Sequence, residues 1–235
     1  MLDFKRYRVL TFDCYGTLID WETGILAALA PVRARSDRRV SDDELLERYA
    51  RAESTIQRGE YRRYREVLRA VLLEVAAYLR VPLGRSEEEL LADSVGDWKP
   101  FPDTVAALKT LRNHYRLAVI SNIDDDLFAR SASRLEAQFD WVVTAEQVRS
   151  YKPYQNNFLR ALERMNVPRH HVLHVAQSRY HDIEPASKLG LDCVWVNRRR
   201  GKTGFGATRQ SDAKPSLEVA NLRELADLVM RAFAV

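Results

Sequence analysis

Short runs of apolar, β-branched residues alternate with longer amphipathic stretches over much of the chain. The first run, Val9 to Phe12, is followed at once by a turn that contains glycine. From Pro100 onward four more runs follow, each separated from the next by a helical pattern: 117–120, 141–144, 172–175 and 193–196. Strands that alternate with helices pair in parallel through right-handed crossovers. The pattern predicts an α/β fold, a parallel sheet with helices on both faces.

Residues 21–98 have a different pattern, without a strand-like run. Three or four amphipathic helices are expected there, and the segments 41–44 and 86–89 each have the Ser-x-x-Glu form of a capping box that opens a helix. The chain is therefore predicted to consist of a core, residues 1–20 and 99–235, with an all-helical domain of residues 21–98 inserted after the first strand.

The end of the chain is predicted to contain two helices joined by a strand and a loop. Asp182 is expected to start a helix that stops at Gly190, a typical C-terminal stop. The polar, glycine-containing stretch 198–215 is expected to be a loop. Residues 217–233 are expected to form the last helix.

Polar side chains follow four of the predicted strands. The carboxyl ends of parallel strands lie at one edge of a sheet, where open α/β sheets bind ligands. Each residue also has an ordinary reading, as a turn residue, a solvated lysine or a helix-capping acid. Together they predict a site at this edge, and its candidate residues are Asp13, Thr17, Ser121, Asn122, Lys152, Ser178 and Asp182.

Composition excludes several classes of protein. The 235 residues are 46% hydrophobic and 30% charged, with a net charge of +4, which is typical of a globular domain and mild for a nucleic-acid-binding protein. No apolar run reaches the roughly 18 residues of a membrane span, and the first residues lack the apolar stretch of a signal peptide. We expect a cytoplasmic protein with a small-molecule substrate and neither nucleic acid nor membrane as partner.

The order and spacing of the polar segments resemble the haloacid dehalogenase (HAD) superfamily of hydrolases. The resemblance covers nearly the whole chain if residues 21–98 are the family's cap domain. It implies a Rossmann-like core under a helical cap, with Asp13 as the nucleophile that forms a covalent ester. The four matching motifs are Asp13-Cys-Tyr-Gly-Thr17-Leu, Ser121-Asn122, Lys152-Pro153 and the stretch from Gln177-Ser178 to Asp182.

Two departures from the family pattern bear on the reaction. Magnesium-dependent phosphatases of the superfamily have an acid where this chain has Tyr15 and a magnesium-binding Asp where it has Gln177. An alkoxide leaving group needs a proton, and a phosphate facing Asp13 needs a cation, whereas a halide leaves without either. The chain is thus most similar to the L-2-haloacid dehalogenases, which implies a hydrolase acting on carbon–halide bonds with no metal and no cofactor.

The resemblance also implies a role for each candidate. Asp13 would attack the halogen-bearing carbon, and water would then release a 2-hydroxy acid. Lys152 would keep Asp13 ionised by lowering its pKa. Asp182 would orient Lys152 or help to activate the water. Hydrogen bonds to the nucleophile or to the substrate carboxylate would come from Thr17, Ser121 and Asn122.

The substrate-binding residues are less directly indicated. The related dehalogenases use a cap arginine, and the corresponding place here falls on Leu45, so Arg48 or Arg51 would have to substitute. Aromatic residues would form an apolar wall around the halogen. The expected substrate-binding residues are Tyr15, Trp21, Arg48, Tyr64, Gln177 and Ser178.

Two other functions stay open at this point. One is a phosphatase that recruits magnesium through Asp13 and Asp182. The other is a catalytically weak binding protein with an arginine-rich surface, either 33–39 or 198–202, as its contact. The resemblance further suggests a homodimer.

Overall fold

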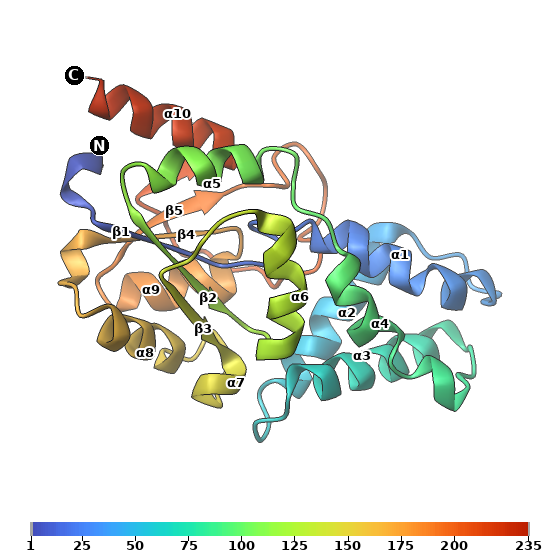
Figure 1. The fold of residues 1–235 in the computed structure, drawn as a ribbon. Helices are drawn as coiled ribbons and strands as arrows, with labels where there is room; N and C mark the ends of the chain where they lie inside the picture. The colour runs from blue at the N-terminus through green and yellow to red at the C-terminus, as the bar shows by residue number, and fades with distance from the viewer. Residues whose placement is uncertain (1, 235) are drawn as a thin grey trace.

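The computed structural model describes residues 2–234 and contains a six-stranded parallel sheet (Figure 1). Its strand order is β3-β2-β1-β4-β5-β6, so the first strand of the chain lies in the interior of the sheet. The strands are β1 (Val9–Phe12), β2 (Arg116–Ser121), β3 (Trp141–Thr144), β4 (Val172–Ala176), β5 (Asp192–Val196) and β6 (Leu217–Val219).

Helices cover both faces of this sheet. On one face lie α5 (Thr104–Arg112), α6 (Asp125–Leu135) and α10 (Leu222–Phe233), and on the other α8 (Asn156–Met165) and α9 (Glu184–Lys188) (Figure 1). The short helix α7 (Ala145–Val148) follows β3. Each face has its own cluster of buried apolar side chains, since successive residues of a strand point to opposite sides. The predicted fold class is confirmed.

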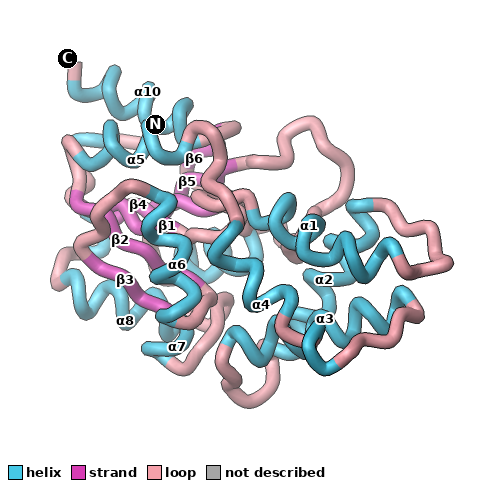
Figure 2. Tube along the Cα trace, turned by 45° about the vertical axis from the view of Figure 1, so that its right-hand side comes forward, coloured by secondary structure: helices cyan, strands magenta, loops and turns pink. Residues whose placement is uncertain are grey.

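The segment between β1 and α5 is helical, as its pattern predicted, and lies beyond one end of the sheet (Figure 2). It contains α1 (Trp21–Ala34), α2 (Asp42–Ile56), α3 (Tyr64–Leu79) and α4 (Leu90–Ser94). Its apolar side chains join the same buried cluster as one face of the sheet. The division into two domains with residues 21–98 as a cap stays a prediction.

Of the two predicted helix starts, one is found, with the N-cap bond of Ser41 but, within the described residues, without the reciprocal Glu44 bond of a capping box. Ser41 caps α2, because its side chain accepts a hydrogen bond from the backbone N–H of Glu44 at 3.2 Å. The prediction for 86–89 is wrong: a 3-10 turn, Arg85–Glu87, forms there and α4 begins only at Leu90. Glu87 instead accepts from the backbone N–H of Gly84 at 2.7 Å, which moves the turn upstream.

The end of the chain also differs from the prediction. Residues 217–219 form β6, a short edge strand, and α10 starts after it with Asn221 as its cap. The helix expected to start at Asp182 is preceded by a π-helical turn over Arg179–Ile183, which Ser178 caps, and α9 follows from Glu184. β6 has only three residues, too few for an apolar pattern to be visible in the sequence, so nothing in the sequence predicted it.

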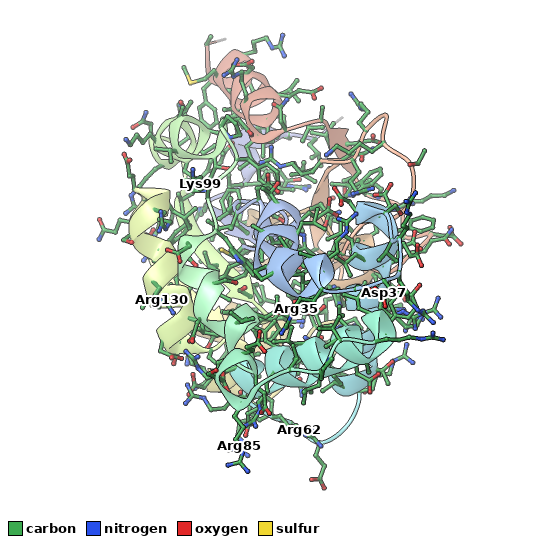
Figure 3. All side chains as sticks on the ribbon, turned by 90° about the vertical axis from the view of Figure 1, so that its right-hand side faces the viewer. Arg35, Asp37, Arg62, Arg85, Lys99 and Arg130 are labelled. Carbon is green, nitrogen blue, oxygen red and sulfur yellow. The ribbon has the colours of Figure 1, made fainter. Side chains whose placement is uncertain are left out.

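Charged side chains cover the outer face of the helical segment (Figure 3). Exposed side chains on this side of the molecule include Arg35, Asp37, Arg62, Arg85, Lys99 and Arg130. Over residues 2–234, no helix has both the length and the apolar character that crossing a membrane requires.

Candidate active site

Asp13 lies directly after β1 and is held by the loops that leave β1 and β4. Its backbone N–H donates to the carbonyl of Val175 at 3.2 Å. The Thr17 hydroxyl donates to Asp13 Oδ2 at 2.7 Å and accepts from the backbone N–H of Gln177 at 2.9 Å. The Asp13 carboxylate is therefore fixed in one orientation before any ligand binds.

The ammonium group of Lys152 lies between two carboxylates. Its Nζ donates to Asp13 Oδ1 at 2.9 Å and to Asp182 Oδ1 at 2.6 Å. A third bond goes to the carbonyl of Ile120 at 2.8 Å, and the side chain is 1% exposed. An ammonium group has three hydrogens, so its donors are all used.

A buried chain of hydrogen bonds continues from Asp182 beneath the sheet edge. His174 Nε2 lies 3.1 Å from Asp182 Oδ1, and His174 Nδ1 lies 2.9 Å from the Thr11 hydroxyl. Because an ionised carboxylate only accepts, Nε2 of His174 carries the hydrogen of the first bond. Sequence inspection missed His174, although it faces Thr11 across two otherwise apolar strands.

The charges of the three groups are coupled. Burial alone would lower the pKa of Lys152, but the two carboxylates outweigh it and hold this pKa above its ordinary value. Burial raises the pKa of Asp182, but Lys152 and His174 outweigh it and leave that pKa lowered. For Asp13 burial wins and its pKa is raised, with Asp182 adding to the effect. Lys152 lowers the Asp13 pKa, as expected, but this effect does not outweigh burial.

These groups line a small cavity of about 30 Å³. That is the volume of a single water molecule in the liquid, so any larger ligand requires the surrounding side chains or helices to move. Three buried polar atoms on its walls have no hydrogen-bond partner within residues 2–234: Ser121 Oγ, His181 Nε2 and Asp182 Oδ2. They are available to a ligand or to water.

The structure brings most of the predicted residues to this cavity. Thr17 reaches it through its bond to Asp13. The residues on its walls that sequence inspection singled out are Asp13, Tyr15, Trp21, Tyr64, Ser121, Asn122, Lys152, Ser178 and Asp182.

Two predicted binding residues lie elsewhere. Arg48 does not line the cavity, since its guanidinium lies over the ring of Tyr78 at 4.0 Å, and this prediction is wrong. The side chain turned away because the buried face of α2 carries Leu45, Tyr49 and Glu53 and not position 48. Gln177 lines a neighbouring groove instead.

Asn122 has a different part from the one expected. Its Oδ1 accepts from the backbone N–H of Lys152 at 2.7 Å, and its Nδ2 donates to the Lys152 carbonyl at 3.0 Å. Asn122 therefore fixes the backbone that carries the ammonium group.

Glu53 is a residue of the cavity wall that sequence inspection missed. It comes from α2 in the helical segment and is 3% exposed. The Tyr64 hydroxyl donates to Glu53 Oε1 at 2.6 Å, and Tyr49 lies one turn before it. Burial, with a contribution from the charge of Asp13, raises the pKa of Glu53 to about 7.

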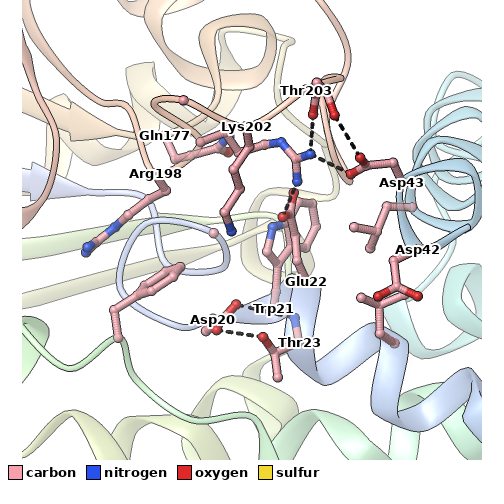
Figure 4. Close-up of a pocket in the computed structure, with 16 residues that line it drawn as sticks. Asp20, Trp21, Glu22, Thr23, Asp42, Asp43, Gln177, Arg198, Lys202 and Thr203 are labelled. Carbon is pink, nitrogen blue, oxygen red and sulfur yellow. Dashed lines mark hydrogen bonds and ion pairs between the residues drawn. The ribbon is translucent and has the colours of Figure 1, made fainter.

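A larger groove of about 490 Å³ (Figure 4) lies beside the cavity around Asp13. Trp21 borders both, so its indole separates them. Arg199 on one side of the groove bonds Glu22 and Asp43, each at 2.6 Å. Lys202 also lines the groove, and no ion pair within residues 2–234 involves it.

Residues 7–190 match the family of haloacid dehalogenase-like hydrolases. The chain belongs to this family. It is thereby a member of a hydrolase family, as the four motifs indicated.

Relatives of this HAD hydrolase have more than one activity. It is 26% identical to an (S)-2-haloacid dehalogenase of Pseudomonas putida over 97% of this chain and 99% of that protein. It is 25% identical to a 5-amino-6-(5-phospho-D-ribitylamino)uracil phosphatase of Escherichia coli (strain K12), over 95% and 97%. The structure of an L-2-haloacid dehalogenase from Xanthobacter autotrophicus has the same fold, with a TM-score of 0.79 at 20% identity over 95% and 98%.

The donor set of this chain does not fit the magnesium ion of the family's phosphatases. Asp13 Oδ1 and Asp182 Oδ1 both accept from the Lys152 ammonium, and the amide Gln177 stands where those enzymes have an acid. Over residues 2–234, no group of three or more His, Cys, Asp or Glu side chains is placed to hold a metal ion. Magnesium requires a near-octahedral set of oxygen ligands, and here Lys152 and Thr17 already occupy both Asp13 oxygens and Lys152 one oxygen of Asp182.

Proposed function

We propose that this HAD hydrolase is a metal-independent dehalogenase of small 2-haloacids, which works through an aspartyl ester on Asp13 and releases 2-hydroxy acids. The observation that carries the proposal is the ammonium of Lys152 between Asp13 and Asp182. This arrangement supplies one positioned carboxylate nucleophile and no site for a divalent cation, which a phosphate dianion facing Asp13 would need. The dehalogenase of Pseudomonas putida, similar over its full length, supports the same reaction.

In the first step an Asp13 oxygen attacks C2 of the substrate. The carbon–oxygen bond forms as the carbon–halogen bond breaks, and the halide leaves with the bonding pair. No proton is needed by the leaving group, which agrees with Tyr15, whose hydroxyl is 2.8 Å from Ser131 Oγ. Thr17 and Lys152 keep the attacking carboxylate oriented.

In the second step water attacks the carbonyl carbon of the Asp13 ester. Asp182 Oδ2 is a buried acceptor without a partner on the cavity wall, so it is suited to orient this water and accept its proton. The Lys152 ammonium stabilises the negative charge that develops on the ester oxygen. Cleavage of the ester bond regenerates the Asp13 carboxylate and releases the 2-hydroxy acid and a proton.

The remaining polar and aromatic wall suits a small substrate. Ser121 Oγ, which has no partner within the described residues, is available to donate to the substrate. Trp21 and Tyr64 would face the halogen and the alkyl group. The helical segment 21–98 would act as the cap that opens this cavity, and a cytoplasmic homodimer is the assembly that the resemblance implies.

Halide and phosphate release over a panel of 2-haloacids and phosphate esters, with and without a chelator, tests the reaction. We expect chelator-resistant halide release and no release of phosphate. Asp13→Asn should release no halide in a single turnover, while the control Asp126→Asn, at an exposed position of α6, should match the original protein. Phosphate release that a chelator abolishes would refute the proposal.

A further inference from the structure

The cavity around Asp13 holds a second buried carboxyl group on the opposite wall. Glu53 Oε1 accepts from the hydroxyls of Tyr64 at 2.6 Å and Tyr49 at 3.4 Å. Within residues 2–234 no hydrogen bond or ion pair involves Glu53 Oε2. Glu53 therefore has one oxygen fixed by two tyrosines and one oxygen left for a ligand.

The cavity offers no free cation to a substrate carboxylate. Of the described residues that line it none is an arginine, and Lys152 uses its three donors on Asp13, Asp182 and the Ile120 carbonyl. An ionised Glu53 would leave three carboxylates against one ammonium. An anionic substrate would then be repelled from the place it must occupy.

Protonation of Glu53 removes this conflict. Its Oε1 already accepts from two hydroxyl groups, so the acidic hydrogen is placed on Oε2, the oxygen that is free to face a ligand. A carboxylic acid that donates to a carboxylate makes a short, charge-assisted hydrogen bond, and such bonds are about twice as strong as neutral ones.

We propose that Glu53 acts as a carboxylic acid that donates its Oε2 hydrogen to the carboxylate of the bound 2-haloacid, and is thus the specificity-determining residue of this cavity. This inference rests on the proposed function and names the group that recognises the acid end of its substrate. It assigns to a neutral donor the role in carboxylate binding that the resemblance gives to a cap arginine.

The proposal predicts that carboxylate binding is coupled to one proton. Glu53 has a pKa of about 7, so the fraction that can donate falls from about one half at pH 7 to about one hundredth at pH 9. Apparent affinity scales with that fraction, which gives a loss of about 50-fold over this range.

The other titratable groups that face the cavity do not produce this dependence. Burial lowers the pKa of His181 to about 4, and burial raises the pKa of Tyr49 and Tyr64 well above the ordinary value. Lys152 has a raised pKa and Asp182 a lowered one, so both keep their charge.

Asp13 is the remaining acid of the cavity, and its titration acts on turnover in the opposite sense. Burial raises the pKa of Asp13, and its loss of a proton activates the nucleophile as the pH rises. Deprotonation of Glu53 has the opposite effect on substrate binding. The two groups therefore give opposite limbs of a pH profile of turnover, and comparison of the original protein with Glu53→Gln isolates the Glu53 contribution to binding.

Calorimetric titration of the protein with propionate, an unreactive carboxylate, tests the proposal without any turnover. In two buffers of different ionisation enthalpy, we expect close to one proton taken up at pH 8 and almost none at pH 5.5. The uncharged analogue propionamide should bind with no uptake at either pH. Proton uptake by the unmodified protein below about 0.2 at pH 8 would overturn the proposal, whatever the variants do.

Glu53→Gln supplies the second arm, because an amide N–H can donate at every pH. The variant should lose the uptake, and its affinity for propionate should change less than threefold from pH 7 to 9. Glu47→Gln, at an exposed position of the same helix, should behave like the original protein. A Glu53→Gln protein that keeps the 50-fold loss would also overturn the proposal.

Halide release from 2-chloropropionate by the same proteins separates this proposal from the proposed function. Coupled propionate binding without halide release at any pH would leave Glu53 as a carboxylate-binding acid and refute the dehalogenase. Halide release with binding that takes up no proton would refute the role of Glu53 and leave the dehalogenase in place.

Discussion

Replacement of Lys152 by methionine tests whether one ammonium holds the two carboxylates of the site together. Methionine retains much of the volume and removes the charge and three hydrogen bonds, those to Asp13, Asp182 and the Ile120 carbonyl. Removal of one partner from a buried ion pair costs about 3–5 kcal/mol, because the remaining charge is left without compensation. Lys152 is 1% exposed and serves two carboxylates, so we expect a loss of about 4 kcal/mol of unfolding free energy at pH 8.

The sign of the pH dependence follows from the same contacts. Without the ammonium, burial and the other acid raise the folded-state pKa of Asp13 further, and the main cause that lowers the pKa of Asp182 is lost. Protonation then relieves the repulsion, so stability of Lys152→Met is recovered at low pH and lost as the pH rises through the raised values. The penalty at pH 5 should be about half of that at pH 8 or less.

Urea unfolding followed by circular dichroism at both pH values measures these quantities. The double variant Lys152→Met/Asp182→Asn removes one charge of each sign and should recover at least about 1 kcal/mol relative to Lys152→Met. The control Lys188→Met, from an exposed pair with Glu184, should change stability by less than about 0.5 kcal/mol. A Lys152→Met penalty below about 1 kcal/mol, or one that is equal at pH 5 and 8, would refute the reasoning.

Three further predictions concern Glu53 in the cavity and Gly16 and Lys202 in the neighbouring groove. The pKa of Glu53 in the folded protein is raised from 4.5 to about 7, so protonated Glu53 contributes its full stability below pH 4.5 and loses it as the pH rises through 7. Relative to Glu53→Gln, the original protein should lose about 2–3 kcal/mol of unfolding free energy between pH 5 and 8, measured by urea unfolding. Gly16 has φ +92°, and a Cβ there would lie 2.8 Å from Trp21 Nε1. Gly16→Ala should therefore lower the unfolding free energy by about 1–3 kcal/mol and reduce halide release. Unchanged stability and halide release would contradict the need for glycine in this turn. Lys202→Met should reduce kcat/KM for 2-haloacids severalfold at low ionic strength and make it less salt-dependent, whereas an identical salt dependence would exclude steering by this groove.

The core of the fold could be predicted because its strands are buried on both faces. β1, β2, β4 and β5 contain mainly apolar runs, interrupted by Thr11 in β1 and His174 in β4, and their burial in a parallel sheet is the reason for that composition. β6 has only three residues at the edge of the sheet, and one of them is exposed, so no apolar run marked it.

The site was predictable where strand ends determine it. Asp13, Lys152 and Asp182 follow β1, β3 and β4 of one parallel sheet, so topology brings them to one edge. The opposite wall was not predictable in this way, because it depends on how α2 is rotated. Arg48 lies one position away from the buried face, and Glu53 is in sequence indistinguishable from a solvated glutamate.

The position of the opposite wall is itself set by contacts from the core. Asp124 follows β2 and is fully buried, and its carboxylate accepts from the backbone N–H groups of Tyr64 at 2.8 Å and Arg65 at 3.0 Å. These are free donors at the start of α3, so Asp124 fixes the first turn of that helix as an N-cap would. Tyr64 then holds Glu53 through the 2.6 Å bond. Since the cavity holds about 30 Å³, admission of a 2-haloacid requires movement of its walls, and the Asp124 bonds are the buried contacts among those that tie the start of α3 to the core.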